Sequence, residues 1–450
     1  MAASIRDATA VSALGTLADG VVGSGWSSGR VQLDAAGIEI DCWIGADDGW
    51  LGAGAAAVQR TATNREAHAD ATIGTATNLH TIRPGVAPAT ESRVRVPGGE
   101  AVLRVYAVAR SDGPLVVADL ENASPAAAVV AWVVRAAPGF RIGRVALDGT
   151  TLLIDERARI ELPRVPSRWA VDARAVGVRD SVIGGGAATG RFEPVTTHRG
   201  DLEVAVLFPI AHRTRTRIAA SAATAASGSV AVAQLPALAD VERGWVVALE
   251  RGTRVELPDE VMQAALDAAR ATLLLGVADE PSRDRVVATE AVAWGFTRGR
   301  SRRAAGAAGT EDPWPLLNAT VDESGTSPRR AAEWLRSVRQ GLVRVTRDGV
   351  DLLPHFPQAW LGRPVAVHDL PTRHGPVSFA LRWHGPKPAL LWEVPAGASV
   401  RASGIDASWT GNGGAGEALL AAIDPTRLLP LRTPSGSDPG VKVDDPGSFT

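Results

Sequence analysis

The residues with the clearest chemical potential are acids that lie close to a tryptophan in the segment GTEDPWPLL. Glu311 and Asp312 lie beside Trp314. A sugar ring can stack on the apolar face of an indole while carboxylates bind its hydroxyl groups. Neighbours in a chain seldom face each other across a bond, so a second acid would have to come from another segment. The candidates for it are Glu290, Asp322 and Glu323. The competing interpretation is that these acids cap helices or face solvent in a loop.

Tryptophan is frequent in this chain, which has 13 tryptophans and one tyrosine. Four of them lie in stretches rich in Gly, Asp or Pro, and we expect these to be exposed platforms for carbohydrate. They are Trp26, Trp50, Trp314 and Trp409. Trp383 and Trp392 alternate with aliphatic residues instead, which predicts that both are core residues.

No metal or cofactor is expected from the remaining patterns. Four of the eight histidines cluster in one stretch, but their spacing matches no metal-binding pattern. They are His355, His368, His374 and His384. The segment 25–29, GWSSG, fits a nucleophile elbow but leads into a strand-like run instead of a helix. The segment 411–416, GNGGAG, fits a dinucleotide fingerprint and precedes EALLAAID, which we interpret as a short helix. Too little chain follows for a βαβ unit.

The composition is that of a globular protein with two or three domains. The 450 residues are 45% hydrophobic and 21% charged, and the net charge of −2 argues against a nucleic-acid surface. A single cysteine, Cys42, excludes an internal disulfide, and we expect it to be a small buried residue. The first residues lack the pattern of a signal peptide, and no apolar run reaches the length of a membrane span. We therefore expect a cytoplasmic protein.

Short β-rich runs between turn signals recur from about residue 30 to residue 257 and predict a large antiparallel β-sandwich over residues 1–257. The last two runs are SVAVAQL and GWVVALERGTRVEL. In the run AVLRVYAVA, Leu103 and Val105 face one way while Arg104 and Tyr106 face the other, so a second sheet can cover one side. Three dipeptides accept the positive φ angles of tight hairpins. They are Gly98-Gly99, Asp112-Gly113 and Asp148-Gly149.

The pattern changes at Pro258, where an amphipathic helix is predicted to begin. Asp259 and Glu260 place negative charge at its amino end, and Gly276 is expected to end it. The residues on its apolar face are Met262, Leu266, Ala269 and Leu273. Two more helices are predicted over residues 283–296 and 328–340, so residues 258–341 form a short helical segment.

The chain returns to β structure over residues 342–432. LVRVTRDGVDLL predicts a hairpin that turns at Asp348-Gly349, and two more strands are expected around Gly385. We expect residues 342–402 to pack against the helices, with Trp383 and Trp392 largely buried. Residues 433–450 are rich in Pro, Gly, Ser and Asp, which predicts disorder. The expected fold class is mainly β with an α segment: a large antiparallel β-sandwich, a short α-hairpin region and a small C-terminal β-domain.

The order of these segments resembles the six-hairpin glycosidases, in which an N-terminal β-supersandwich precedes an (α/α)6 toroid and a small β-domain. The resemblance rests on the junction 245–276 and on the stretches LLPHFPQAW, RWHG and ALLWEV. It implies that one carboxylic acid protonates a glycosidic oxygen while a carboxylate activates water or phosphate. On this resemblance the candidate catalytic residues are Glu311, Asp312 and Asp322. A toroid of twelve helices needs roughly 200 residues, so residues 258–341 correspond to a reduced toroid.

The resemblance leaves three functions open. The first is a glycosidase-like protein that binds carbohydrate with little or no hydrolysis. The second is an active glycoside hydrolase or phosphorylase whose paired carboxylates are completed in a homo-oligomer. The third is a structural or scaffolding protein. Carbohydrate is the expected partner, and neither nucleic acid nor a membrane is expected.

Overall fold

The computed structural model is mainly β, as the sequence predicts. Along the chain, antiparallel sheets are followed by helices and then by a carboxyl-terminal β region. The described residues are 31–33, 36–46, 49–53, 57–59, 73–74, 80–82, 86–87, 89–96, 98–108, 115–173, 177–178, 181–182, 184–222, 230–279, 284–297, 328–425 and 428. They fall into two compact units. The first unit comprises described residues of Met1–Arg254, Ala264–Arg300 and Glu323–Glu333, and the second those of Val255–Gln263 and Trp334–Thr450.

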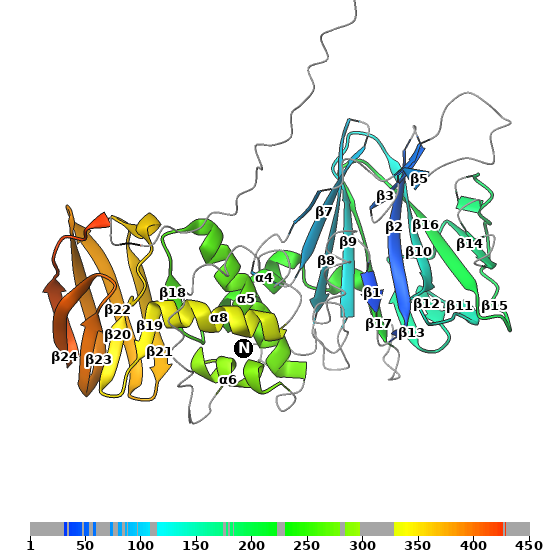
Figure 1. Cartoon of the computed structure of the whole chain (residues 1–450). Helices are drawn as coiled ribbons and strands as arrows, with labels where there is room; N and C mark the ends of the chain where they lie inside the picture. Colours follow the sequence, from blue (N-terminus) through cyan, green and yellow to red (C-terminus); the bar gives the residue numbers. More distant parts are fainter. Residues whose placement is uncertain are drawn as a thin grey trace, which may run out of the picture. The chain divides into compact units, whose positions relative to one another are not determined.

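Two antiparallel sheets make up the β part of the first unit (Figure 1). One sheet has the strand order β14-β16-β10-β2-β3-β4-β5, with β1 beside β2. Its strands are β1 Val31–Leu33, β2 Ile38–Ala46, β3 Gly49–Ala53, β4 Ala57–Gln59, β5 Ile73–Gly74, β10 Ala128–Ala136, β14 Arg168–Ala173 and β16 Leu202–Ile210. The other sheet has the strand order β15-β11-β12-β13-β17-β9-β8-β7-β6. Its strands are β6 His80–Ile82, β7 Thr90–Val96, β8 Gly99–Val108, β9 Leu115–Asn122, β11 Arg144–Asp148, β12 Thr151–Ile154, β13 Ala158–Glu161, β15 Val195–Thr196 and β17 Arg215–Ala222.

The core of this unit lies between the two sheets, because alternate residues of each strand point inward. Trp132 and Phe208 from one sheet pack in the same buried cluster as Leu103 and Val105 from the other. Cys42 belongs to this cluster, as expected. The predicted alternation in β8 is therefore confirmed.

The hairpin turns follow the predicted dipeptides where the structure describes them. Gly98 (φ 75°) lies between β7 and β8, and Gly149 (φ 58°) lies between β11 and β12. Both adopt the left-handed conformation that glycine tolerates best. Asp112-Gly113 lies outside the described residues.

Five helical elements of the described chain lie between β17 and β20. They are the 3₁₀ turn η3 Val232–Gln234 and the helices α4 Leu238–Leu249, α5 Glu260–Asp279, α6 Arg285–Ala293 and α8 Pro328–Leu342. The predicted apolar face of α5 is confirmed, since Met262, Leu266, Ala269 and Leu273 are all buried. Asp259 caps this helix by accepting a hydrogen bond from the Met262 amide at 2.9 Å.

The two strand predictions nearest these helices were wrong. SVAVAQL contains the turn η3, and the first part of GWVVALERGTRVEL forms the end of α4, so only Arg254–Glu256 of that run is a strand (β18). In α4 the buried residues are Trp245, Ala248 and Leu249. Their spacing of three and four residues is that of a helix face, which outweighs the β propensity of the two valines between them.

A buried arginine ties the end of α4 to α5. The Arg270 guanidinium donates from Nη2 to the carbonyl oxygens of Leu249 at 2.7 Å and Thr253 at 2.8 Å. Burial lowers the pKa of Arg270, while the nearby Asp267 carboxylate favours its charged form. The Leu249 carbonyl belongs to the last turn of α4, which has no intrahelical partner for it, and the Thr253 carbonyl lies just beyond the helix.

Gly276 does not end α5, which continues to Asp279. A Cβ atom at this position would lie 2.2 Å from Cβ of Pro328 in α8 and 3.2 Å from Cγ1 of Val287 in α6. The glycine therefore permits close packing of three helices instead of terminating one.

The second unit is built on a third sheet, in the order β18-β21-β22-β23-β20-β19, with β24 beside β23. Its further strands are β19 Val343–Val345, β20 Gly349–Leu352, β21 Val365–Thr372, β22 Gly375–His384, β23 Lys387–Ala402 and β24 Asp406–Leu419, and the 3₁₀ turn η4 Gln358–Trp360 precedes β21. The predicted hairpins β19–β20 and β22–β23 are confirmed. At Gly349 a Cβ atom would lie 1.9 Å from the Ser399 carbonyl oxygen, so glycine is needed where β20 runs beside β23.

Two expectations for this region need correction, and a third is not tested. EALLAAID is not a helix, because residues 406–419 form the strand β24. Trp383 and Trp392 are half-buried instead of largely buried. Trp383 belongs to an aromatic cluster with Phe356 and Trp360, and its indole Nε1 donates to the Arg363 carbonyl at 2.8 Å. The predicted disorder of residues 433–450 concerns positions outside the described residues.

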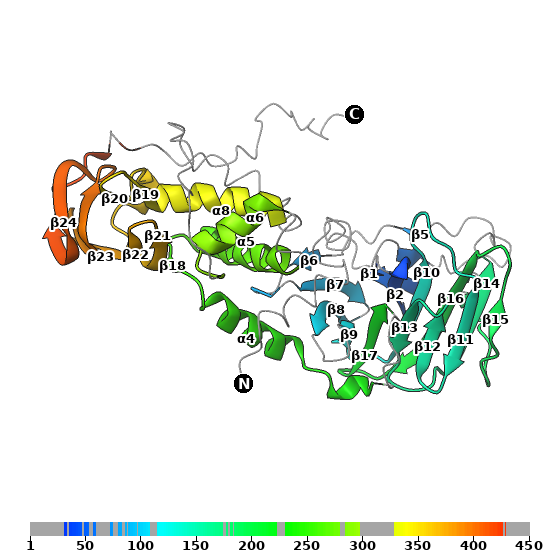
Figure 2. The same ribbon diagram turned by 90° about the horizontal axis from the view of Figure 1, so that it is seen from below.

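Strands β23 and β24 form a long hairpin that curls strongly (Figure 2). A fully extended strand of 14 residues spans about 45 Å. Yet Oδ2 of Asp406, at the start of β24, accepts a hydrogen bond from the Ala421 amide at 3.4 Å, just beyond its end. Residues Pro395 to Ala398 of β23 bulge opposite Gly413, which lets the hairpin bend.

Candidate functional site

Most of the sequence-predicted site residues lie outside the described residues. These are Glu311, Asp312, Asp322, Glu323, Trp26 and Trp314. Trp50 lies in β3, where it pairs with Gly45 of β2. Among the predicted acids Glu290 is described, and its side chain is fully buried in α6, so it cannot reach a ligand in solvent.

The structure brings together two tryptophans on one face of the β23–β24 hairpin. The rings of Trp392 in β23 and Trp409 in β24 have centroids 5.1 Å apart and planes at 67°. Both side chains are half-buried. The Trp392 indole Nε1 donates to the Asn412 carbonyl oxygen at 3.1 Å. Trp409 is one of the predicted platforms, whereas Trp392 was assigned to the core.

Two glycines of β24 make room for these indoles. A Cβ atom at Gly411 would lie 2.9 Å from the Trp409 ring and 3.3 Å from the Trp392 ring. A Cβ atom at Gly416, which pairs with Trp392, would lie 2.3 Å from the Trp392 ring. The GNGGAG segment thus contributes space for an aromatic pair, and its resemblance to a nucleotide-binding fingerprint is coincidental.

Alternation along β24 separates this aromatic face from a more exposed face. Trp409, Gly411 and Gly416 are half-buried, whereas Thr410 and Glu417 are exposed. We call the set Trp392, Trp409, Gly411 and Gly416 the tryptophan pair site. It offers indole faces and backbone, which suits an uncharged ligand with an apolar face.

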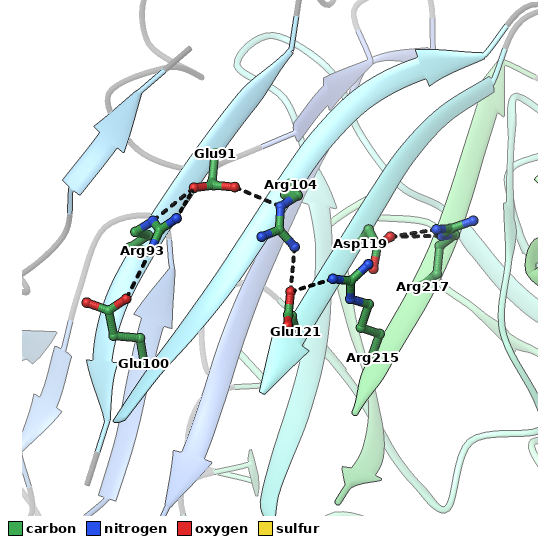
Figure 3. A network of polar contacts seen from close by, with 8 residues as sticks. All are labelled: Glu91, Arg93, Glu100, Arg104, Asp119, Glu121, Arg215 and Arg217. Carbon is green, nitrogen blue, oxygen red and sulfur yellow. Dashed lines mark hydrogen bonds and ion pairs between the residues drawn. The ribbon is translucent and has the colours of Figure 1, made fainter. Parts of the chain in front are cut away.

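A separate cluster of charged side chains lies in the first unit, on the face of β7, β8, β9 and β17 that points away from the sandwich core (Figure 3). It consists of alternating acids and arginines from four neighbouring strands. They are Glu91, Arg93, Glu100, Arg104, Asp119, Glu121, Arg215 and Arg217. We call this set the charge ladder.

Each arginine of the charge ladder contacts an acid. Arg104 bridges Glu91 and Glu121, with N–O distances of 2.7 Å to each. Arg93 lies 2.7 Å from Glu91 and 3.3 Å from Glu100. Cross-strand pairs of opposite charge stabilise a sheet, and the equal numbers of both signs leave the ladder without a net charge that would select an ionic ligand.

The far end of the ladder is covered by the chain that leads into α4. Arg217 lies 2.6 Å from Asp119 and donates to the Leu235 carbonyl at 2.9 Å. The buried Tyr106 hydroxyl donates to the Pro236 carbonyl at 2.9 Å, and burial raises the pKa of Tyr106 to about 12. These contacts fasten the segment 235–236 to the sheet, so we interpret the ladder as a structural feature.

Ionisation of the ladder depends on its arginines. Burial disfavours the charged form of Glu91, but hydrogen bonds from Arg93 and Arg104 outweigh it and lower the pKa of Glu91. The hydrogen bond from Arg104 likewise lowers the pKa of Glu121. Because the pKa of Glu91 is lower in the folded than in the unfolded protein, ionised Glu91 stabilises the fold. This stabilisation is complete at pH values above the ordinary glutamate pKa of 4.5, and it is lost as the pH falls through the pKa of the folded state.

Replacing Glu91 by glutamine is expected to destabilise the first unit at pH 7 by about 1 kcal/mol or more, because charge-assisted hydrogen bonds to two arginines are lost. The difference from the native protein should shrink as the pH falls below 4.5. Urea denaturation across this pH range measures both effects. Glu156→Gln is the matched control, since the Glu156 side chain is 86% exposed and 3.7 Å from its arginine. Equal losses in the two variants would contradict the role of the ladder.

The other candidate chemistries find no support in the described part of the chain. There it contains no group of three or more His, Cys, Asp or Glu residues that could hold a metal ion. His374 contacts the Thr346 carbonyl oxygen through Nε2 at 3.0 Å, and His384 is exposed at the β22–β23 turn. Burial raises the pKa of the Cys42 thiol well above its ordinary value, which makes it unreactive. None of the described helices is long and apolar enough to span a membrane.

Comparison with solved structures gives only weak likeness at the level of a single matched chain. No protein-family model and no curated protein sequence matches this chain. The chain is similar to a bacterial glucoamylase solved in complex with acarbose, with a TM-score of 0.34 and 6% identity over 52% of this chain. The match spans 35% of the glucoamylase chain. A likeness at this level settles neither family nor activity, and the six-hairpin resemblance stays a prediction from the sequence.

Proposed function

We propose that this protein binds carbohydrate at the tryptophan pair site. The observation that carries the proposal is the half-buried pair Trp392 and Trp409, held ring against ring on a glycine-rich strand. A half-buried indole is held in place by its packing and still offers part of its surface to a ligand. The C–H face of a pyranose is apolar, and an indole presents an apolar face with a negative quadrupole, so the two surfaces are complementary.

The rigidity of the pair supports this function. The hydrogen bond from Trp392 Nε1 to the Asn412 carbonyl fixes the orientation of one indole, and contact with that ring restrains Trp409. A side chain that is ordered before binding loses little conformational entropy when the ligand arrives. The two indoles are therefore held in place before a ligand arrives, as expected of a binding surface.

Catalysis by Glu311, Asp312 and Asp322, alone or completed by a second subunit, stays a prediction from the sequence. A screen of α- and β-glucosides, rhamnosides and maltodextrins, with and without phosphate, tests it. Turnover near ordinary enzyme rates of ~1 to 10³ per second would favour the active glycosidase over the binding protein. No observation in the described chain favours the scaffolding alternative.

Replacing Trp409 by alanine is expected to weaken carbohydrate binding at least about tenfold, the factor that corresponds to ~1.4 kcal/mol for a central aromatic contact. Isothermal titration with the best glycan from the screen gives the dissociation constant. Trp383→Phe is the matched control, because Trp383 is another half-buried tryptophan of the same sheet that packs on Phe356. The proposal fails if no glycan binds the native protein, or if Trp409→Ala binds as tightly as Trp383→Phe.

A further inference from the structure

We infer that the tryptophan pair site holds one sugar ring at a time and disfavours anionic sugars relative to neutral ones. The inference rests on the proposed function and specifies its ligand class. It follows from where the charged side chains of the hairpin lie and from the angle between the two indoles.

Three charged side chains of the hairpin lie on the opposite face from the indoles. Glu393 follows Trp392 in β23 and Glu417 follows Gly416 in β24, and successive residues of a strand point to opposite faces. Arg401 pairs with Thr410, the neighbour of Trp409, and is likewise exposed on that opposite face. No basic side chain of the hairpin is therefore placed beside the indoles to hold a carboxylate, sulfate or phosphate group.

Asp406 is the acid closest in sequence to Trp409, at the start of β24. Its carboxylate accepts hydrogen bonds from the Ser408 hydroxyl at 2.7 Å, the Ser408 amide at 3.0 Å and the Ala421 amide at 3.4 Å. The Ser408 hydroxyl, with these amides, holds the pKa of Asp406 below its ordinary value, so the group is negative at neutral pH. Its oxygens are engaged within the hairpin, and its charge opposes a second negative charge nearby.

The angle between the indoles restricts how many sugars stack. The planes of Trp392 and Trp409 meet at 67°, so a flat glycan chain can lie along one indole face but not along both. The centroids are only 5.1 Å apart, which places the two rings in contact and leaves no separate position for a second sugar between them. A longer flat chain therefore gains no second stacking contact.

One of the two indole donors is already engaged within the hairpin. Trp392 Nε1 donates to the Asn412 carbonyl oxygen. Recognition at this indole then depends on the C–H face of the sugar and much less on particular hydroxyl groups. This favours pyranosides that present an unsubstituted C–H face.

Ligand-observed NMR titrations with matched small glycosides test the inference on the full chain. We expect methyl glucoside to bind about fivefold more tightly than methyl glucuronide, the ratio for ~1 kcal/mol of charge repulsion in water. The affinity for the neutral glycoside should not change between low and high salt. Extending a cello-oligosaccharide from two to four units should change the affinity by about twofold or less, since no second ring stacks.

The outcomes separate the inference from the proposed function. Failure of every glycan to bind, or binding that Trp409→Ala leaves intact, contradicts the proposed function itself. Binding that Trp409→Ala abolishes, but that is equal for glucoside and glucuronide or rises steeply with chain length, overturns the inference alone.

Discussion

Trp360→Ala is expected to lower the free energy of unfolding of the second unit by about 3–5 kcal/mol, the range for truncating a fully buried aromatic side chain. Trp360 is 0% exposed in the turn η4 and packs edge-on against Phe356, with ring centroids 6.2 Å apart. Truncation leaves a cavity that the surrounding β-sheet cannot fill by small shifts. Urea denaturation followed by far-ultraviolet circular dichroism measures the loss.

The matched comparison is Trp383→Ala, which removes the other tryptophan that contacts Phe356. Its ring centroid is also 6.2 Å from that of Phe356, but its side chain is half-buried and reaches the Arg363 carbonyl. Solvent already touches one side of this indole, so truncation removes less buried surface and should cost clearly less than Trp360→Ala. Equal losses would mean that Trp383 is a core residue, as the sequence pattern predicts.

This pair of tryptophans shows what alternation can and cannot predict. Trp383 alternates with Val377, Phe379 and Leu381, and these three residues are buried as expected. The face on which the Trp383 side chain lies is thus consistent with the pattern, but its degree of burial is not. Burial depends on which residues cover the end of the strand. A pattern of period two carries no information about that cover.

Much of the fold was accessible from local patterns. Many strands of the sandwich, the apolar face of α5, and the turns at Gly98, Gly149 and Gly385 follow from side-chain period and backbone preference. The charge ladder also left a signal that the sequence interpretation missed. Glu91 and Arg93 are two residues apart, as are Asp119 and Glu121, and Arg215 and Arg217. Two residues that are two positions apart in a strand lie on the same face of the sheet. Charges placed in this way can pair with opposite charges on a neighbouring strand.

The rest required tertiary information. The tryptophan pair site joins residues from two strands of a curled hairpin, and the curl depends on a bulge whose position no local pattern specifies. Gly411 and Gly416 match a dinucleotide fingerprint that the sequence context argues against, and in the fold they provide space for Trp392 and Trp409. A glycine indicates that a Cβ atom is excluded, but the neighbour that excludes it is known only from the structure.

The same reasoning gives a prediction in which two glycines of helices respond in opposite directions to one substitution. Gly276→Ala is expected to destabilise the first unit by about 2–3 kcal/mol through overpacking. The new Cβ atom would lie 2.2 Å from Cβ of Pro328 and 2.8 Å from its Cγ, and a proline ring has no rotamer that moves it away. Helix α8 would have to shift relative to α5, which disturbs the buried contact with Val287 as well.

Gly244→Ala, in α4, is the matched control and should stabilise the protein by about 0.5–1 kcal/mol. No heavy atom lies within 4 Å of a Cβ atom built at Gly244, so the substitution adds only the helix propensity of alanine over glycine. Chemical denaturation of both variants under the same conditions gives the two signs. If Gly276→Ala is also stabilising, α5 and α8 do not pack as closely as the structure has them, and Gly276 acts only as a weak helix residue.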